Sequence, residues 1–324
     1  MNLSQLAKAA GVSVATASKA FSGSDEISEA TRQRIFDLAR QNGVFDRYNK
    51  HRFSKPIIAV ICPEFVSNYY EVFVAKAEKE ILRHNGLVIA SATDFDPTRE
   101  RELFNYYAHY CRVDGIMLID CYTAVENPKL VPTVAIDLGQ NRHMDTIRLD
   151  MRAAMDAAID RLRRYGHTRI GFAGEQLTGI KQNIFTEAMQ KADLPLLPEW
   201  VKISDTRFAP AGEQAAAAWL AEGTLPTAVV AAYDDLAVGL QHALTAHGLS
   251  VPGDVSLIGM DDMSFSPYVA PPLSSINMHI EEACRCAVEI LLRKRDNQFY
   301  SPRSETVLTA DFVPRGSIGP VKIG

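Results

Sequence analysis

From Pro56 onward, short apolar runs alternate with amphipathic segments along the chain. The runs PIIAVICPE, LVIASAT, DGIMLID, RIGFAGE, AVVAAY and VSLIGMDD are continuous, which is typical of strands buried on both sides. Segments 69–85, 96–111, 151–165 and 236–247 are amphipathic and typical of helices. The alternation predicts an α/β core of doubly wound parallel sheets covered by helices. The strands are too many for one small open sheet, so we expect two similar lobes divided near Asp150.

The first 46 residues carry a different pattern, with three short helices and no strand. We expect a helix over 4–10, a tight turn at Gly11 and a second helix over 14–21. Ser13 and Ser28 are suitable N-caps for the second and third helices. The arrangement predicts a helix-turn-helix. Its small core would be formed by Leu3, Leu6, Ala10, Val12, Ala17 and Ala20.

The outward face of the second helix is the candidate DNA-reading surface. Its side chains are short enough to enter a major groove and touch base edges. They are Val14, Ala15, Thr16, Ser18 and Lys19. The alternative is a small helical cap that binds nothing, but the complete set of turns and caps favours DNA binding.

Charge is distributed unevenly along the chain. The 324 residues have a net charge of −5, but residues 1–55 hold nine Lys or Arg against five Asp or Glu. A weakly basic end on an acidic body fits a protein that contacts DNA at one end only, although an excess of this size also arises by chance. Residues 47–56 are polar and basic, and we expect them to link a headpiece, residues 1–46, to a core, residues 57–324.

Cysteine use and hydropathy bear on the compartment. The five cysteines are odd in number and scattered, and the sequence opens without a secretory signal. No apolar run approaches the roughly 20 residues that span a bilayer. We therefore predict a reduced, cytoplasmic protein that does not associate with membranes. Cys284 and Cys286 form a C-x-C pair, which we interpret as packing residues rather than as a metal site.

Polar or aromatic residues follow most of the predicted strands. Ligands of open parallel sheets bind beyond the carboxyl ends of the strands, so these residues can meet in one cleft. Carboxylates there would accept hydrogen bonds from a polyhydroxylated ligand. The alternative for any single residue is a solvated strand end or a helix cap. The residues are Glu64, Thr93, Asp94, Asp120, Tyr122, Asp137, Asp150, Tyr233, Asp234, Asp261 and Asp262.

Patterns of common enzymes are missing from the sequence. No G-x-G-x-x-G follows a strand, no G-x-S-x-G occurs, and the eight histidines lack the spacing of metal ligands. We therefore predict no enzymatic activity, no cofactor and no metal. A sugar-binding module without DNA-dependent regulation is the remaining alternative.

Several long stretches resemble the lactose/galactose repressor (LacI/GalR) family of bacterial transcription regulators. They are AAGVSVATASKAF, SEATRQRI, RVDGIMLID, GHTRIGFAG, LPTAVVAAYDDLAVG and GLSVPGDVSLIGMDDMSFSPYVAPPLSSI, and they cover almost the whole chain in the order of the family. The resemblance implies a homodimer that binds palindromic operator DNA. It also implies a core like a periplasmic sugar-binding protein, with an N-lobe over 57–149 and 279–306 and a C-lobe over 150–278 and 307–324. A small effector, usually a sugar or its phosphate, would bind between the lobes and change the operator affinity.

The resemblance assigns roles to the headpiece and linker. Val14, Ala15 and Lys19 fall where the family reads bases, with Lys19 replacing the more usual Arg, and Thr16 and Ser18 fall where it contacts phosphates. The family's hinge element Ala-Arg-x-Leu is missing, and the hinge is several residues shorter. Phosphate contacts and an apolar minor-groove wedge would then come from the linker itself. The full predicted DNA-binding set is Ser13, Val14, Ala15, Thr16, Ser18, Lys19, Arg47, Lys50, Arg52 and Phe53.

The resemblance also points to effector-binding residues. Asp150 matches the family's effector-binding Asp, and Lys181 stands where an Arg typically clamps sugar hydroxyls or an anionic group. Two acidic positions of the C-lobe and a pair of aromatic residues that line the cleft are matched as well. With the strand-end residues Asp94 and Tyr122, the predicted set is Tyr69, Tyr70, Asp94, Tyr122, Asp150, Lys181, Asp234 and Asp261.

Overall fold

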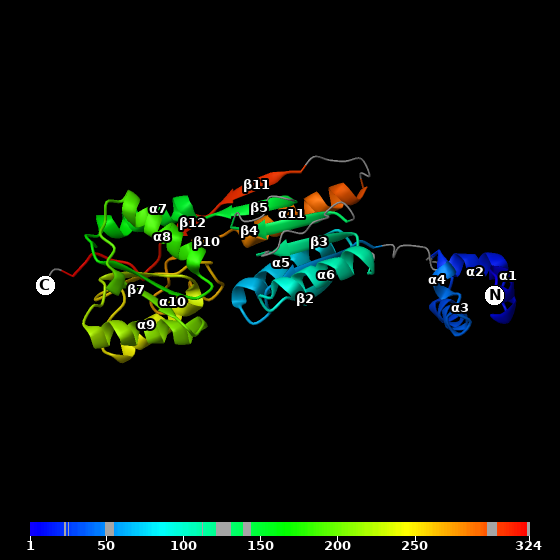
Figure 1. Ribbon diagram of the computed structural model, residues 1–324, viewed down its shortest axis with the longest axis horizontal. Coiled ribbons are helices and arrows are strands. Elements are labelled where there is room, and N and C mark those ends of the chain that lie inside the picture. Colours follow the sequence, from blue (N-terminus) through cyan, green and yellow to red (C-terminus); the bar gives the residue numbers. More distant parts are fainter. Residues whose placement is uncertain are drawn as a thin grey trace.

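The computed structural model describes residues 1–22, 24, 26–48, 55–111, 113–120, 131–138, 144–296 and 303–322. Its elements form three groups, which are a helical headpiece and two α/β lobes, called here the N-lobe and the C-lobe (Figure 1). The predicted fold class is confirmed, with a helix-turn-helix headpiece followed by parallel sheets covered by helices.

The headpiece is built from α1 (Leu3–Ala9), α2 (Val14–Phe21), α3 (Glu29–Gln41) and the short α4 (Phe45–Tyr48). Both predicted N-caps are present, since Ser13 Oγ accepts from the Thr16 amide at 3.0 Å and Ser28 Oγ from the Thr31 amide at 3.3 Å. Gly11 adopts a φ of +65°, which allows the tight turn between α1 and α2. The helices bury a small core of Leu6, Ala10, Ala20, Phe21, Ile35, Ala39 and Val44.

The N-lobe contains a six-stranded parallel sheet in the order β11-β5-β4-β3-β1-β2. Its strands are β1 (Ile57–Cys62), β2 (Leu87–Ala92), β3 (Gly115–Ile119), β4 (Thr133–Asp137), β5 (Asp145–Asp150) and β11 (Glu305–Thr309). Successive residues of β1 point to opposite faces, so Ile58 and Val60 pack with α5 (Asn68–Arg83) and α11 (Ile280–Asp296). Ala59 and Ile61 pack with α6 (Pro97–His109). Burial on both faces explains why the strand sequences are apolar throughout.

The C-lobe repeats this plan with a four-stranded parallel sheet in the order β7-β6-β8-β9. Its elements are α7 (Arg152–Arg164), β6 (Ile170–Glu175), α8 (Gly179–Lys191), a 3-10 turn (Pro198–Trp200), β7 (Val201–Ser204), α9 (Phe208–Glu222), β8 (Ala228–Ala231), α10 (Asp234–Ala246) and β9 (Ser256–Ile258). Phe172 and Val230 face α7 and α8, and Ala173 and Val229 face α9 and α10. Helices α9 and α10 lie so close that a Cβ at Gly239 would stand 2.0 Å from the Ala209 carbonyl oxygen.

The chain crosses between the lobes after β5, after β10 (Ser275–Asn277) and before β12 (Asp311–Val313), and β10 and β12 pair antiparallel. The division expected between residues 306 and 307 falls inside β11, which pairs with β5 along its whole length and so belongs to the N-lobe sheet. The pattern did not predict β7 and β11, whose residues are mostly half-buried or exposed, nor the short α4, β10 and β12.

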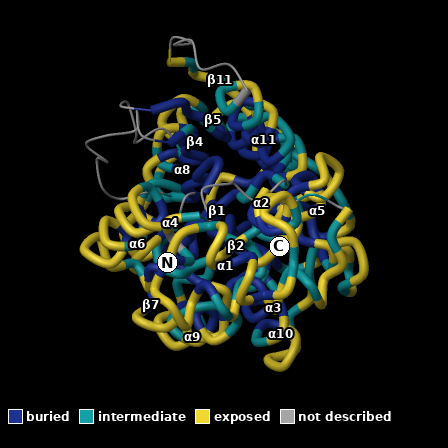
Figure 2. Tube along the Cα trace, turned by 90° about the vertical axis from the view of Figure 1, so that its right-hand side faces the viewer, coloured by how far each residue is buried: buried dark blue, intermediate teal, exposed yellow. Residues whose placement is uncertain are grey.

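Burial is concentrated in the strands of the core, while the outer turns of the surrounding helices are exposed (Figure 2). Among the helices in the described ranges, none combines the length and the hydropathy of a membrane-spanning segment.

Candidate DNA-binding and effector sites

Helix α2 presents one buried and one exposed face. Ala17 and Ala20 are fully buried against the other headpiece helices, whereas Val14 is 46% exposed. The other residues predicted to face DNA are exposed as well, apart from the half-buried Thr16, and they are Ser13, Ala15, Ser18 and Lys19. An apolar residue left exposed at the start of such a helix is in the position from which base edges are read.

Charge on this face is partly compensated within the headpiece. Lys19 forms an ion pair with Glu26, and both side chains are largely exposed. Water screens such a pair, so a phosphate or a base can replace Glu26 at small cost. Arg47 is exposed at the end of α4 and lies over the Tyr48 ring at 5.6 Å. Lys50, Arg52 and Phe53 lie outside the described residues.

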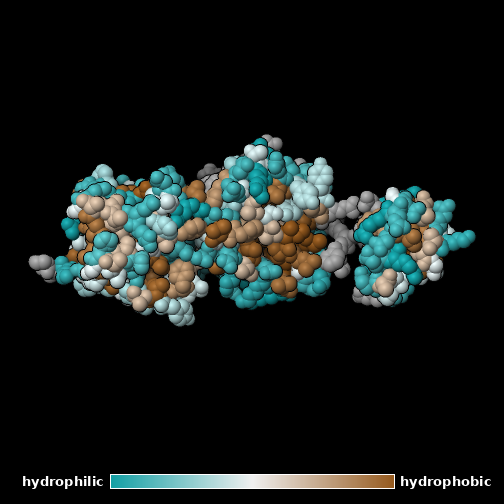
Figure 3. Space-filling model, turned by 90° about the horizontal axis from the view of Figure 1, so that it is seen from below, coloured by the Kyte–Doolittle hydropathy of each residue, from teal (hydrophilic) through white to brown (hydrophobic). Residues whose placement is uncertain are grey.

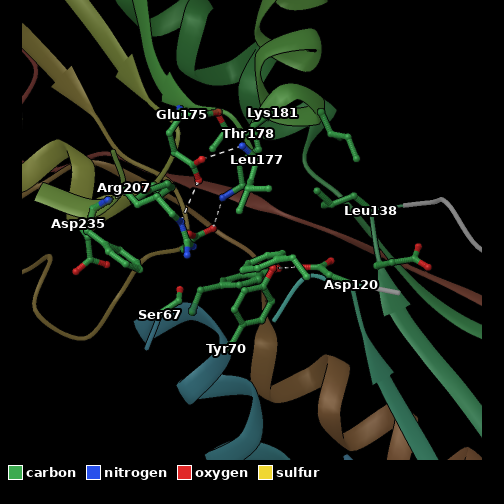
Figure 4. Close-up of a pocket in the computed structure, with 17 residues that line it drawn as sticks. Ser67, Tyr70, Asp120, Leu138, Glu175, Leu177, Thr178, Lys181, Arg207 and Asp235 are labelled. Atoms are coloured by element: carbon green, nitrogen blue, oxygen red, sulfur yellow. Dashed lines mark hydrogen bonds and ion pairs between the residues drawn. The ribbon is translucent and has the colours of Figure 1, made fainter. Parts of the chain in front are cut away.

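Between the two lobes lies a cavity of about 140 Å³ (Figure 4). This volume is close to that of a cavity that holds one six-membered ring. The N-lobe lines it with Ser67, Tyr69, Tyr70, Phe95, Asp120, Asp137 and Leu138. The C-lobe lines it with Glu175, Leu177, Thr178, Ile180, Lys181, Arg207, Phe208, Tyr233, Asp235 and Asp261. Most of these residues follow the carboxyl end of a strand, as expected for a ligand site in open parallel sheets.

Four residues of the predicted effector set line the cavity, namely Tyr69, Tyr70, Lys181 and Asp261. Tyr122 lies outside the described residues. The expectation that Asp94, Asp150 and Asp234 line the cleft is corrected, because none of them reaches the cavity.

Each of these three carboxylates has a local reason to be elsewhere. Asp94 sits in a turn with φ of +57° and its side chain is exposed, while the next residue, Phe95, faces the cavity. Asp150 ends β5 and forms ion pairs with Arg148 at 3.0 Å and Arg152 at 3.6 Å.

Asp234 is fully buried at the start of α10 and accepts hydrogen bonds from Ser266 Oγ, Ser275 Oγ and the Met263 amide at 2.5 to 2.8 Å. Burial raises the pKa of this carboxyl to about 7 although all three donors favour its ionised form. Its role is structural, because it joins α10 to the crossover strand β10, and the next residue, Asp235, lines the cavity instead.

Lys181 is held inside the site by several groups. Its Nζ donates to Asp261 Oδ1 and to the Ala232 carbonyl oxygen, both at 2.9 Å. The same ammonium lies 5.5 Å from the centre of the Tyr69 ring and 5.9 Å from that of Tyr233. Burial raises the pKa of Asp261, and the neighbouring Lys181 opposes the rise.

Asp120 follows β3 and accepts a hydrogen bond from the Tyr70 hydroxyl at 3.0 Å. The pKa of Asp120 is raised to about 6. Burial is the main cause, the charges of Asp137 and Asp261 add to it, and the Tyr70 hydrogen bond and the charge of Lys181 oppose it. This end of the cavity therefore gathers three carboxylates around one ammonium group.

Arg207 joins the two lobes at the other end of the cavity. Its guanidinium donates to both carboxylate oxygens of Glu64, at 2.7 and 2.8 Å, and lies 3.6 Å from Glu175. The guanidinium also stacks between Phe95 and Phe208, at 5.2 and 4.7 Å from the ring centres. The sequence analysis did not predict Arg207. The available signal was its partner Glu64, a strand-end carboxylate that needs a cation when it is buried.

A second contact joins the lobes beside this ion pair. Asn68 Nδ2 of the N-lobe donates to Asp235 Oδ1 of the C-lobe at 2.7 Å. Burial raises the pKa of Asp235, and the bond from Asn68 opposes the rise. Both contacts span the cleft, so the relative position of the lobes is coupled to what fills the cavity between them.

Comparison with known proteins agrees with this arrangement. Residues 2–43 match the family model described as bacterial regulatory proteins, lacI family, and residues 159–318 match a periplasmic binding protein-like domain. The repressor CytR of Escherichia coli K12 is 26% identical over 97% of this chain and 95% of its own length.

Two solved structures show the same fold. The lac repressor dimer bound to operator and an anti-inducer aligns with a TM-score of 0.75 at 20% identity, over 98% of each chain. A LacI family regulator from Enterococcus faecium with bound ribose aligns with a TM-score of 0.70 at 24% identity, over 82% of this chain and 100% of that one. The chain thus joins a lacI-family helix-turn-helix domain to a periplasmic binding protein-like core, as do the LacI-family regulators to which it is similar.

Proposed function

We propose that this regulator is a homodimeric repressor that binds a palindromic operator and responds to a small carbohydrate-like effector in the inter-lobe cavity. The observation that carries the proposal is the presence, in one chain, of an exposed α2 face and of a cavity to which both lobes contribute. In this proposal the cavity binds its ligand without converting it.

Operator recognition is assigned to α2. Val14, Ala15 and Lys19 would meet base edges, and Ser13, Thr16 and Ser18 would contact phosphates, which fix the register of the headpiece. Lys19 donates without the bidentate geometry of Arg, so its preference for a guanine rests on a single point charge. Arg47 would add a phosphate contact, which is independent of sequence and sensitive to salt. Lys50, Arg52 and Phe53 stay in the proposal as linker contacts to DNA.

Effector binding is assigned to the cavity between the lobes. Aromatic rings can stack on a sugar face, and carboxylates accept hydrogen bonds from its hydroxyls. The Enterococcus faecium relative, whose structure contains ribose, supports a carbohydrate of this size. A ligand that contacts both lobes changes their relative position, and operator and effector must then alter each other's affinity by the same factor.

Dimerisation is assigned to the N-lobe. Strand β2 is an edge strand, and Leu87 and Ile89 on it are 40% and 38% exposed. Leu82 on the neighbouring α5 is 56% exposed. Figure 3 shows hydrophobic surface gathered over the N-lobe, and apolar area of this kind marks an interaction surface. A second copy would bury it and place two headpieces for a two-fold symmetric site.

Selection of bound sequences from a random DNA library by the purified protein tests the operator part. We expect enrichment of a palindrome, loss of base preference in Lys19→Ala, and a change in affinity when a ligand that raises the melting temperature is added. Ligand binding without any selected DNA sequence would instead support the sugar-binding module. If Lys19→Ala loses the same affinity for operator and for random DNA, Lys19 contacts a phosphate rather than a base.

A further inference from the structure

The cavity has a strong excess of acidic groups. Among the described residues that line it, five carboxylates come from both lobes, against the two cations Lys181 and Arg207. The carboxylates are Asp120, Asp137, Glu175, Asp235 and Asp261. Charge that is partly removed from water is costly unless it is compensated, so this excess bears on the charge of the ligand.

Both cations already have carboxylate partners from the protein. Lys181 uses two of its three N–H donors on Asp261 and the Ala232 carbonyl oxygen. Arg207 is taken up by the bidentate pair with Glu64. A sugar phosphate would find donors without a hydrogen bond, such as the third N–H of Lys181 and the Nε–H of Arg207, only on cations whose charge is already compensated, and it would meet the surrounding carboxylates. The site therefore disfavours an anionic ligand.

Two of the carboxylates accept hydrogen bonds from neutral groups instead. Asp120 accepts from the Tyr70 hydroxyl and Asp235 from the Asn68 amide. Figure 4 shows these two acids on opposite sides of the cavity. Acidic side chains are more concentrated on the Asp120 side of the cavity, because the charges of Asp137 and Asp261 lie near enough to raise the pKa of Asp120.

The walls of the cavity also suit a cation. Tyr69 and Tyr233 already flank the Lys181 ammonium, and Phe95 and Phe208 flank the Arg207 guanidinium. Aromatic faces attract positive charge, and they do so more strongly where water is excluded. Carboxylates and rings together provide acceptors for hydroxyls and a negative environment for an amine.

We propose that the effector carries a protonated amine on a small hydroxylated ring, as a hexosamine does, and that the amine binds on the Asp120 side of the cavity. This inference rests on the proposed effector site and specifies the class of ligand it takes. Asp120 would accept a charge-assisted hydrogen bond from the amine, with Asp137 and Asp261 adding to the attraction. The ring hydroxyls would donate hydrogen bonds to acceptors on the other side of the cavity, where Asp235 lies.

The test compares matched ligands on the purified full-length protein by calorimetric titration at pH 7. Glucosamine, galactosamine and mannosamine are each measured beside the N-acetyl derivative, the parent hexose and the hexose 6-phosphate. We expect at least one hexosamine to bind about tenfold or more tightly than its three neutral or anionic counterparts, since one charge-assisted hydrogen bond distinguishes them. A parent hexose or 6-phosphate that binds as tightly, or no binding of any hexosamine at millimolar concentration, overturns the proposal.

Two variants separate charge from shape. Asp120→Asn keeps the size of the side chain and an oxygen that accepts from Tyr70, and it should bring the hexosamine and its parent hexose to nearly equal affinity. Asp94→Asn removes an exposed carboxylate outside the cavity and should leave the preference intact. A preference that survives Asp120→Asn contradicts the placement of the amine. Operator binding by the same preparations shows whether the proposed function holds when this inference fails.

Discussion

The headpiece takes its core and its exposed α2 face from residues 1–48, whereas the cavity takes side chains from separate segments between Ser67 and Asp261. In the headpiece, each N-cap side chain of α1, α2 and α3 accepts a hydrogen bond from the backbone amide three residues later. At the cavity, the lining residue Arg207 pairs with Glu64, which is 143 residues away and belongs to the other lobe. A site built from neighbours in sequence can be inferred from local rules, and a site built across lobes depends on how the lobes close.

The same contrast applies to stability. The headpiece packs its own small core, separate from the large cores of the two lobes. A substitution that unfolds the headpiece should therefore abolish DNA binding and leave ligand binding by the core intact. A substitution in the cavity should abolish ligand binding and leave DNA binding intact.

The largest expected effect is that of Leu6→Ala, which removes a fully buried side chain from the headpiece core. A loss of about 2–5 kcal/mol is expected for such a cavity, enough to unfold a domain this small. Circular dichroism should show lost helix at 25 °C and operator binding should disappear, while the core keeps its melting temperature. Leu197→Ala, at an exposed leucine of the C-lobe, is the control. A lower melting temperature of the core in Leu6→Ala would contradict the independence of the two regions.

Arg207→Ala should have the next largest effect, and it acts on the core. It leaves Glu64 and Glu175 facing each other without a cation, and we expect a loss of roughly 2 kcal/mol, less than for a fully buried pair because the Arg207 side chain is 29% exposed. Chemical denaturation of the core measures it. In the double variant with Glu64→Gln the losses should be less than additive; additive losses would mean that the pair does not hold the lobes together.

Ser13→Ala should destabilise the headpiece by about 1 kcal/mol, because the Thr16 amide at the start of α2 loses its acceptor. The headpiece transition in a thermal scan should shift down and the core transition should stay. Ser13→Asp, which restores an acceptor at the N-cap, should recover the loss, and a failure to recover it would assign the effect to something other than capping.

The smallest effect concerns the pH dependence of the core. The pKa of Asp120 is raised to about 6, so the neutral form is favoured in the fold; the corresponding stability is present near pH 4 and is lost as the pH rises through 6. The side chain of the Asp120→Asn variant stays neutral at every pH. The melting temperature of this variant minus that of the original chain should therefore increase between pH 5 and pH 8. The titratable and charged groups that face Asp120 are Cys62, Tyr70, Asp137, Lys181 and Asp261. If the difference in melting temperature between Asp120→Asn and the original chain stays constant across this range, Asp120 does not titrate there.

Adjacent residues illustrate where sequence reasoning ended. Asp234 and Asp235 both follow β8, and the sequence analysis chose Asp234 for the cavity, whereas the structure places Asp235 there. The first turn of α10 directs Asp234 into the interior, against Ser266 and Ser275, and leaves Asp235 facing the cleft. Likewise, a turn with positive φ exposes Asp94 and places Phe95 in the wall. Both outcomes depend on the backbone direction at one residue, which composition does not specify.

By itself, the sequence determined the parallel α/β core, the three headpiece helices with their caps, and the general location of a ligand site beyond the strand ends, because periodicity and capping act over a few residues. Only the tertiary structure decided which strand-end residues meet in the cavity. It brought Arg207 to Glu64 and placed Asp120 near Asp137 and Asp261. These contacts depend on the twist of two sheets and on the closure of two lobes, and no short stretch of the chain encodes either.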